Sequence, residues 1–370
     1  MKKITVTSPL LPPLTDFTTL LEDIWERKWL TNNGTYHNLL EEKLEQYLGV
    51  EKICLFSNGT LALSAAIQAL EIQGEVITTP YSFVATSHAI ALNNLTPVFV
   101  DIEPHTFNLD PAKIEDAITD KTSAIIPVHV YGNPCDHEEI KRIADKHNLK
   151  IIYDAAHAFG VKKNDNSILN WGDLSVLSFH ATKAYSTIEG GAVVCHSQEM
   201  KNKLDKLKSF GFVSETEISL LGTNAKMNEV QAAFGLLSLN LIDEAIKKRK
   251  EISELYRELL NEIEGIKFLE ETSSIKQNYS YFPILVDEAS FGMTRDMLYH
   301  KLHDKSILAR RYFYPLITDF ELYREKINIV KHEIDIANEI SNKIICLPIH
   351  HELTEGEVKF IVNLIKGTEE

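Results

Sequence analysis

The chain has few cysteines, and their spacing matches no common metal or redox motif. Its 370 residues include four cysteines, and none of them forms a CxxC pair. A disulfide framework or a zinc site would need closely and regularly spaced cysteines. We therefore expect reduced thiols, most of them buried as small apolar side chains. The four are Cys54, Cys135, Cys195 and Cys346.

Long hydrophobic runs are also missing. No stretch reaches the roughly 18 apolar residues that would predict a membrane-spanning helix. The first residues, MKKITVTSPLLPPL, contain no apolar segment followed by a signal-peptidase site. We therefore expect a cytoplasmic protein that needs no membrane partner.

Positive charge is scarce relative to negative charge. The chain has 38 lysines and arginines against 53 aspartates and glutamates, a formal net charge of -15 with histidine neutral. This balance disfavours a nucleic acid or an anionic membrane as the main partner, and we expect neither. A phosphorylated small ligand stays compatible with it, because local backbone donors can hold a phosphate whatever the net charge.

The first half of the chain alternates short apolar runs with helical patterns. Near-continuous apolar strands separated by helices predict an α/β fold with a mostly parallel sheet buried on both faces. Ligands of such folds bind at the carboxyl ends of the strands. The expected strands are 52–56, 75–80, 97–102, 124–130, 150–154, 174–179 and 191–196.

The pattern changes after about residue 200, where long helical segments predominate. A strand-like run at 280–287 and another at 344–349 are followed by a helix for which Thr354 and Glu357 form a capping-box pattern. We therefore predict a large domain over 1–245 and a smaller α+β domain over 246–370.

Two motifs at predicted strand ends could bind a phosphate and a flat ring. In SNGTLALSAA, Gly59 and Thr60 open a helix of small residues, where backbone N–H groups and the helix dipole attract an anion. In TTPYSFVAT, Phe83 could lie against a ring system. Taken singly, an Asn-Gly turn and a core aromatic explain these motifs as well.

A lysine and an aspartate follow two further predicted strands. Lys183 comes after LSVLSF, where partial desolvation would make its amine a Schiff-base nucleophile. Asp154 ends the apolar run IIYD, and a buried carboxylate there could pair with the ring nitrogen of pyridoxal phosphate (PLP), with His157 beside the ring. A surface lysine and a helix-capping aspartate are the alternatives. A phosphate cradle, an aromatic, an aspartate and a lysine at successive strand ends together favour a PLP site.

The order of these motifs resembles the DegT/StrS family of sugar-nucleotide aminotransferases. The resemblance runs from WLTNNGTYHNLLEEKL through SNGTLAL, TPYSFVATSHAI, YDAAHAFG, SFHATK and GTNAKMNEVQAA to ICLPIH, nearly the whole chain. It implies the fold-type I, aspartate-aminotransferase-like architecture, a mostly parallel central sheet with a smaller α+β C-terminal domain.

The resemblance also implies roles for individual residues. Lys183 matches the Schiff-base lysine, Asp154 the partner of the pyridine nitrogen, His157 the residue near the ring hydroxyl and Phe83 the stacking aromatic. The matching phosphate ligands are Gly59, Thr60 and Ser178, together with Asn224, which in the family reaches the phosphate from the other subunit. A homodimer with shared active sites is therefore expected. The chain departs from the family's N-x-R-M segment by having Lys226 in place of arginine, which loses the planar fork.

The resemblance further implies the substrates. L-glutamate is the usual amino donor of the family, and a dTDP-linked keto sugar is the expected acceptor. The variants SFHATK, NGTLAL and ARRYFYPL are closest to a branch that aminates C4 of dTDP-4-keto-6-deoxyglucose for O-antigen or other surface polysaccharides. The alternative is amination of C3 in a dTDP-3-keto-6-deoxyhexose. A sugar dehydratase of the same fold or a non-catalytic regulator is disfavoured, since Lys183 is a lysine here and not the histidine of the dehydratases.

The ARRYFYPL segment offers candidate substrate contacts. Arginine forks suit a diphosphate and aromatic rings suit a base. We expect Arg310, Tyr312 and Tyr314 to contact the nucleotide, although a packing patch at a strand edge is an alternative.

Overall fold

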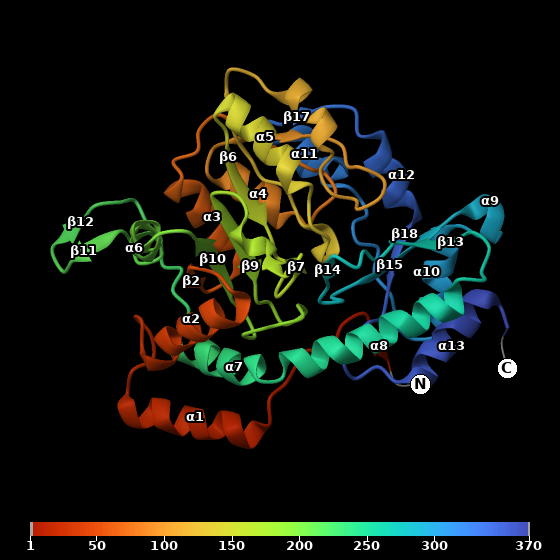
Figure 1. The fold of residues 1–370 in the computed structure, drawn as a ribbon, viewed down its shortest axis with the longest axis horizontal. Helices are drawn as coiled ribbons and strands as arrows, with labels where there is room; N and C mark the ends of the chain where they lie inside the picture. Colours follow the sequence, from red (N-terminus) through yellow and green to blue (C-terminus); the bar gives the residue numbers. More distant parts are fainter. Residues whose placement is uncertain (1–2, 369–370) are drawn as a thin grey trace.

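A computed structural model describes residues 3–368 of the chain. Its largest element is an eight-stranded sheet in the order β17-β4-β3-β5-β6-β9-β10-β2 (Figure 1). All neighbouring pairs are parallel except those of β10, which runs antiparallel to both β9 and β2. The strands are β2 (Lys52–Phe56), β3 (Glu75–Thr78), β4 (Thr96–Phe99), β5 (Thr122–Ile125), β6 (Lys150–Asp154), β9 (Leu174–Ser178), β10 (Gly191–Cys195) and β17 (Val330–Lys331).

Helices cover both faces of this sheet, as the near-continuous apolar strands require. One face packs against α3 (Gly59–Ala69), α4 (Ala85–Leu92) and α6 (Gln198–Leu207). The other face packs against α2 (Thr35–Leu48) and α7 (Glu229–Leu239) at one end and against α5 (His137–His147) at the other. Helix α1 (Leu14–Arg27) lies outside this layer and contacts α7 through an edge-on pair of Phe17 and Phe234.

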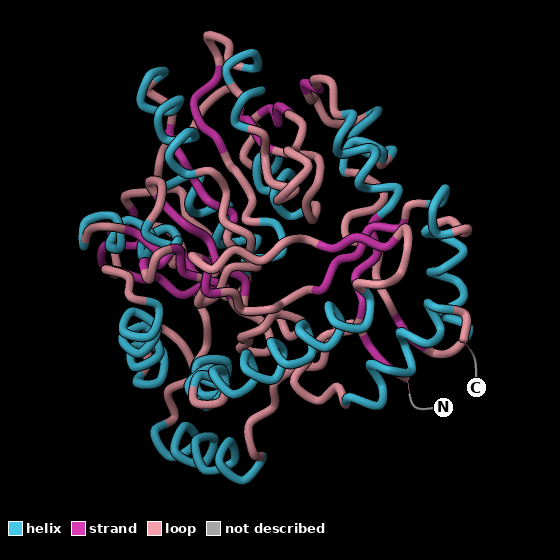
Figure 2. Tube along the Cα trace, turned by 45° about the vertical axis from the view of Figure 1, so that its right-hand side comes forward, coloured by secondary structure: helices cyan, strands magenta, loops and turns pink. Residues whose placement is uncertain are grey.

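A second, three-stranded antiparallel sheet lies beside the first, in the order β13-β15-β18. Figures 1 and 2 show α8 and α13 running along one face of this small sheet, where their apolar side chains form a separate core. Its elements are α8 (Ile242–Leu260), β13 (Ile266–Phe268), β15 (Phe282–Val286), α9 (Glu288–Phe291), α10 (Arg295–Asp304), α12 (Asp335–Lys343), β18 (Ile344–Leu347) and α13 (Glu355–Lys366). Thr354 and Glu357 form the expected capping box of α13.

Shorter elements connect the two regions. Strand β1 (Ile4–Thr5) pairs with β16 (Ile307–Leu308), and β14 (Ile275–Lys276) pairs with β7 (Lys162–Lys163), which also pairs with β8 (Asn166–Ser167). Helix α11 (Glu321–Glu325) precedes β17, which joins the large sheet from the second half of the chain. The boundary at 245/246, which falls in the first turn of α8, stays a prediction.

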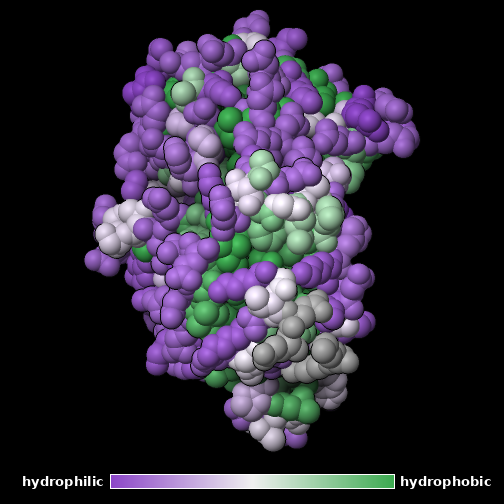
Figure 3. Space-filling model, turned by 90° about the vertical axis from the view of Figure 1, so that its right-hand side faces the viewer, coloured by the Kyte–Doolittle hydropathy of each residue, from purple (hydrophilic) through white to green (hydrophobic). Residues whose placement is uncertain are grey.

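Two surface features bear on partners. A hairpin of β11 (Phe212–Ser214) and β12 (Glu217–Ile218) projects away from the large sheet at the left of Figure 1. Figure 3 shows the opposite side of the molecule, where hydrophilic side chains surround a limited apolar strip. Within residues 3–368, no helix has the length and apolar character needed to cross a membrane.

Candidate active site

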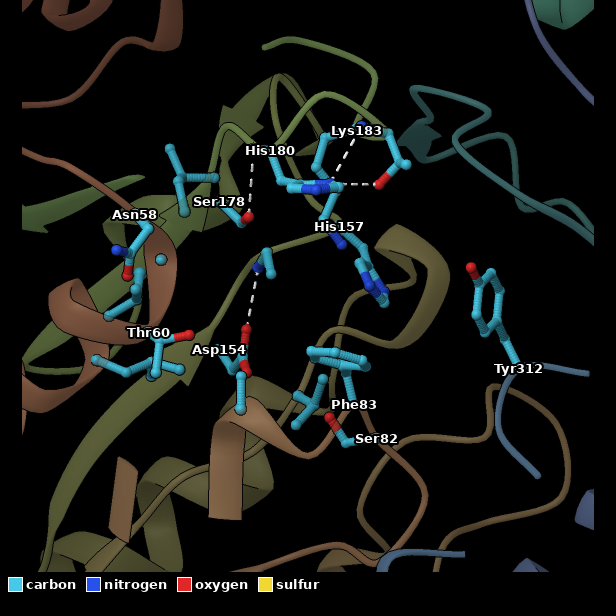
Figure 4. Close-up of a pocket in the computed structure, with 18 of the residues that line it drawn as sticks. Asn58, Thr60, Ser82, Phe83, Asp154, His157, Ser178, His180, Lys183 and Tyr312 are labelled. Atoms are coloured by element: carbon cyan, nitrogen blue, oxygen red, sulfur yellow. Dashed lines mark hydrogen bonds between the residues drawn. The ribbon is translucent and has the colours of Figure 1, made fainter. Parts of the chain in front are cut away.

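A cavity of about 300 Å³ lies at the carboxyl ends of β6 and β9, where the fold predicts a ligand site. The start of α3 and the segment after β3 form two of its walls, and side chains from the region of the small sheet form a third (Figure 4). Eight of the residues expected from the sequence line it. They are Gly59, Thr60, Phe83, Asp154, His157, Ser178, Lys183 and Tyr312.

The amine of Lys183 lies in this cavity, on the turn that follows β9. Its backbone N–H donates to His180 O at 2.9 Å, and its Nζ lies 3.5 Å from the hydroxyl of Tyr281. Burial lowers the pKa of Lys183 to about 8, although the nearby carboxylate of Asp154 opposes this effect. An amine with this pKa is partly neutral near pH 7, as a nucleophile or a base must be.

Asp154 ends β6 and is buried beneath the cavity. Its Oδ2 accepts a hydrogen bond from Thr86 Oγ1 at 2.7 Å, and its Oδ1 accepts one from the backbone N–H of Ala156 at 3.1 Å. Burial nevertheless raises the pKa of this carboxyl above its usual range, and the nearby Lys183 charge only partly compensates. A protonated ring nitrogen placed against this carboxylate would offset the cost of burying its charge.

His157 also lines the cavity and directly follows Ala156, whose backbone N–H binds Asp154. Its Nδ1 accepts the backbone N–H of Tyr131 at 3.2 Å, so in the neutral ring Nε2 carries the proton. Burial, and after it the charge of Lys183, hold the pKa of His157 well below its usual range. The ring is therefore a neutral hydrogen-bond donor into the cavity near pH 7.

The start of α3 forms the anion end of the cavity. Asn58 caps this helix by accepting the backbone N–H of Leu61 at 2.9 Å. The N–H groups of Gly59 and Thr60 belong to the first turn, where no helical carbonyl can accept them. A Cβ at position 59 would lie 3.0 Å from the Cβ of Ser178, so glycine allows the helix start to approach the end of β9. Two backbone donors and the Ser178 hydroxyl therefore gather at one place.

Phe83 is the aromatic residue that was predicted to stack on a flat ligand ring. Phe83 is 59% exposed, and Figure 4 shows its ring among the side chains that line the cavity. An exposed aromatic ring at the mouth of a cavity suits a flat ligand ring, which would cover it on binding.

Sequence analysis did not predict several residues that line the cavity or lie directly behind it. Thr86 donates its hydroxyl hydrogen to Asp154 and lies three residues after Phe83, in the same TTPYSFVAT motif. Helical spacing from Phe83 could have identified it. Tyr281 and Phe313 reach the cavity from distant segments. No local signal marks Tyr281, whereas Phe313 lies in the ARRYFYPL segment, next to the predicted Tyr312. Tyr281 has its ring 4.8 Å from that of His157 and 5.8 Å from that of Tyr312.

Three expected residues do not line the cavity of this chain. Asn224 is exposed, and its Oδ1 accepts from Lys226 Nζ at 2.9 Å. Arg310 is exposed at its backbone pairing with Cys346. Tyr314 lies outside the cavity, beneath the guanidinium of Arg295, 4.3 Å from the centre of its ring.

The donor set fits PLP. The start of α3 and Ser178 could hold its phosphate, Asp154 its ring nitrogen, Phe83 its ring face and Lys183 its aldehyde carbon, each at a different side of one cavity. The ring hydroxyl could accept the proton that His157 holds on Nε2.

Comparison with known proteins agrees with a PLP site. A model of the DegT/DnrJ/EryC1/StrS aminotransferase family matches residues 15–366. The chain is 54% identical over 365 residues to the dTDP-4-amino-4,6-dideoxy-D-glucose transaminase of Shigella dysenteriae, and 50% identical over 367 residues to a transaminase of the same name from Escherichia coli. Each match covers 99% of both chains. The crystal structure of DesI with its TDP-sugar product has a TM-score of 0.94 at 32% identity, and the match covers 99% of this chain and 93% of that one.

These matches confirm the expected fold and cofactor. The solved neighbours include the aminotransferase PseC of Helicobacter pylori, with a TM-score of 0.91 at 28% identity over 99% of both chains. The chain belongs to the DegT/DnrJ/EryC1/StrS aminotransferase family and is a PLP-dependent aminotransferase.

Proposed function

We propose that the protein transfers the amino group of L-glutamate to C4 of dTDP-4-keto-6-deoxyglucose, which gives dTDP-4-amino-4,6-dideoxyglucose for a surface polysaccharide. The observation that carries the proposal is identity of 50–54% along the whole chain to two transaminases named for this product. Relatives named for GDP- or UDP-linked amino sugars are only 29–33% identical.

We assign the cofactor contacts to the residues that line the cavity. Gly59, Thr60 and Ser178 bind the phosphate, Phe83 stacks on the ring, and Asp154 keeps the ring nitrogen protonated. When bound, PLP supplies the electron sink that makes the α-proton of an amino acid acidic.

The residues of this chain then move the proton. With PLP bound, Lys183 Nζ would take the proton from the α-carbon of glutamate in the first half-reaction and would deliver a proton to the sugar carbon in the second. Its pKa of about 8 places it near the optimum for a group that must both accept and release a proton near pH 7.

We also propose that two copies of the chain pair and share their active sites. Asn224 is exposed on a segment fixed to the end of β2 by the hydrogen bond from Ser57 N–H to Ala225 O at 2.8 Å. The nearby hairpin exposes apolar side chains that a partner could cover. These are Phe210, Phe212, Val213, Ile218 and Leu221, each between 44% and 94% exposed.

Mixed dimers test the shared site. Inactive Lys183→Ala and Asn224→Ala variants, co-expressed with different tags, should regain activity in the mixed species, because one of its two sites then carries both native residues. A mixed dimer as inactive as its parents, or a fully active monomer, would contradict the shared site.

The reaction is tested by measuring release of 2-oxoglutarate from glutamate. Release should depend on dTDP-4-keto-6-deoxyglucose and vanish in Lys183→Ala, whose fold is checked by circular dichroism. Release with a dTDP-3-keto-6-deoxyhexose but not with the 4-keto sugar would favour the alternative C3 reaction.

A further inference from the structure

One buried arginine is not used by the site described so far. Arg249 lies on α8 and is completely buried, yet none of its three guanidinium nitrogens has a hydrogen-bond partner among residues 3–368. Burying an arginine without a partner costs several kcal/mol, so proteins seldom keep one without a use for its charge. By contrast, Arg257, two turns along the same helix, pairs with Glu271 at 2.8 Å.

The side chains around Arg249 offer further unpaired polar atoms. Its charge acts on His350 and His351, and the Nδ1 atoms of both rings lack a hydrogen-bond partner in the described structure. Burial and then the Arg249 charge lower the pKa of His350 to about 4, so this ring is neutral at pH 7. A guanidinium and two imidazoles with open hydrogen-bonding positions together suit an anionic oxygen group.

Tyr281 connects this group to the active site. It lines the cavity, and its hydroxyl lies 3.5 Å from Lys183 Nζ, at the long end of the hydrogen-bond range. The charge of Arg249 also acts on the phenol of Tyr281 and favours its ionisation. Burial has the stronger effect and raises the pKa of this phenol. The ring of Tyr281 also packs against those of Tyr131, His157 and Tyr312, at centroid distances of 5.6, 4.8 and 5.8 Å, so it would have to turn within this cluster to let a substrate group reach Arg249.

Both substrates of the proposed reaction carry the matching chemistry. Glutamate has carboxylates and the dTDP-sugar has a diphosphate, and a guanidinium fork binds either through two parallel hydrogen bonds. Resting on the proposed function, we infer that Arg249 is a substrate-binding residue that receives an anionic oxygen group of a substrate past Tyr281. The ion pair formed on binding then offsets the cost of the buried charge.

The test separates the two substrates. The variants are Arg249→Met, which keeps the length and removes the charge, and Arg249→Lys, which keeps the charge without the fork. Arg257→Met is the matched control on the same helix. For each we would measure the glutamate dependence of the donor half-reaction by the change in cofactor absorbance, dTDP affinity by calorimetry, and the melting temperature.

In Arg249→Met, we expect the concentration of half-saturation for glutamate or the dissociation constant of dTDP to rise about tenfold or more, the range for losing a charged hydrogen bond. The cofactor absorbance should persist and the melting temperature should stay or rise, since an unpaired buried charge has been removed. Arg249→Lys should recover part of the affinity, and Arg257→Met should bind both ligands as the wild type does.

If only the half-saturating concentration of glutamate rises, Arg249 binds a carboxylate. If only the dissociation constant of dTDP rises, Arg249 binds the diphosphate. Either result supports the inference. Unchanged binding of both ligands would overturn it. Loss of the fold or of the cofactor absorbance in Arg249→Met would also overturn it, because Arg249 would then be a structural residue. Failure of the proposed function is seen separately, in wild-type protein that does not aminate the sugar.

Discussion

Replacing Lys183 by methionine should make the cofactor-free protein more stable while it abolishes turnover. The pKa of Lys183 is about 8 in the fold because of burial, against an ordinary value near 10.4. The difference of about 2.5 pKa units, at about 1.4 kcal/mol each, corresponds to roughly 3 kcal/mol of unfolding free energy that the charged lysine costs below pH 8. Methionine has a similar length and carries no charge.

The pH dependence follows from the sign of this shift. Between about pH 8 and pH 10.4 the unfolded chain holds the lysine proton and the folded chain does not, so wild-type stability rises with pH through that window. The advantage of Lys183→Met should therefore be largest at pH 7 and disappear near pH 10.5. Urea unfolding of both proteins, freed of cofactor, measures it.

Lys248, which is exposed and pairs with Glu251 at 2.7 Å, provides the control. Lys248→Met should bring no such gain at pH 7. The reasoning is refuted if Lys183→Met is less stable than the wild type at pH 7, or if the difference between them is the same at pH 7 and pH 10.5.

Two further substitutions test the cofactor contacts. Gly59→Ala should weaken PLP binding, because the new Cβ would lie 3.0 Å from that of Ser178. The control Gly356→Ala, whose new Cβ would have no atom within 4 Å, should bind PLP normally. Equal PLP affinity of the two variants would contradict a phosphate site at the start of α3. Thr86→Val should weaken PLP binding about tenfold, the value of about 1.4 kcal/mol expected for the hydrogen bond to Asp154. Unchanged cofactor absorbance on dilution of Thr86→Val would exclude that role.

Much of the large sheet could be predicted from the sequence because each strand is buried on both faces and reads as an apolar run. The runs at 52–56 and 150–154 match β2 and β6 in full. The run at 124–130 is only partly a strand: β5 ends at Ile125, shortly before Pro127, which has no N–H to donate to a ladder.

Elements with little apolar character were not predictable. Strand β17 has two exposed residues, and only its pairing with β4 defines it. Predicted site residues at strand ends, such as Asp154 and Lys183, meet in the cavity because a parallel sheet brings its carboxyl ends together. Tyr281 and Arg249 belong to distant segments whose approach depends on packing of the small sheet, which no local pattern encodes.

The position of the new amine tests the central claim most directly. The protein would be incubated with ¹⁵N-labelled glutamate and dTDP-4-keto-6-deoxyglucose, and the product analysed by NMR. The proposed function predicts the label on C4 of a 4-amino-4,6-dideoxyglucose linked to dTDP. A label on C3, or no labelled sugar from protein that carries PLP, would contradict it.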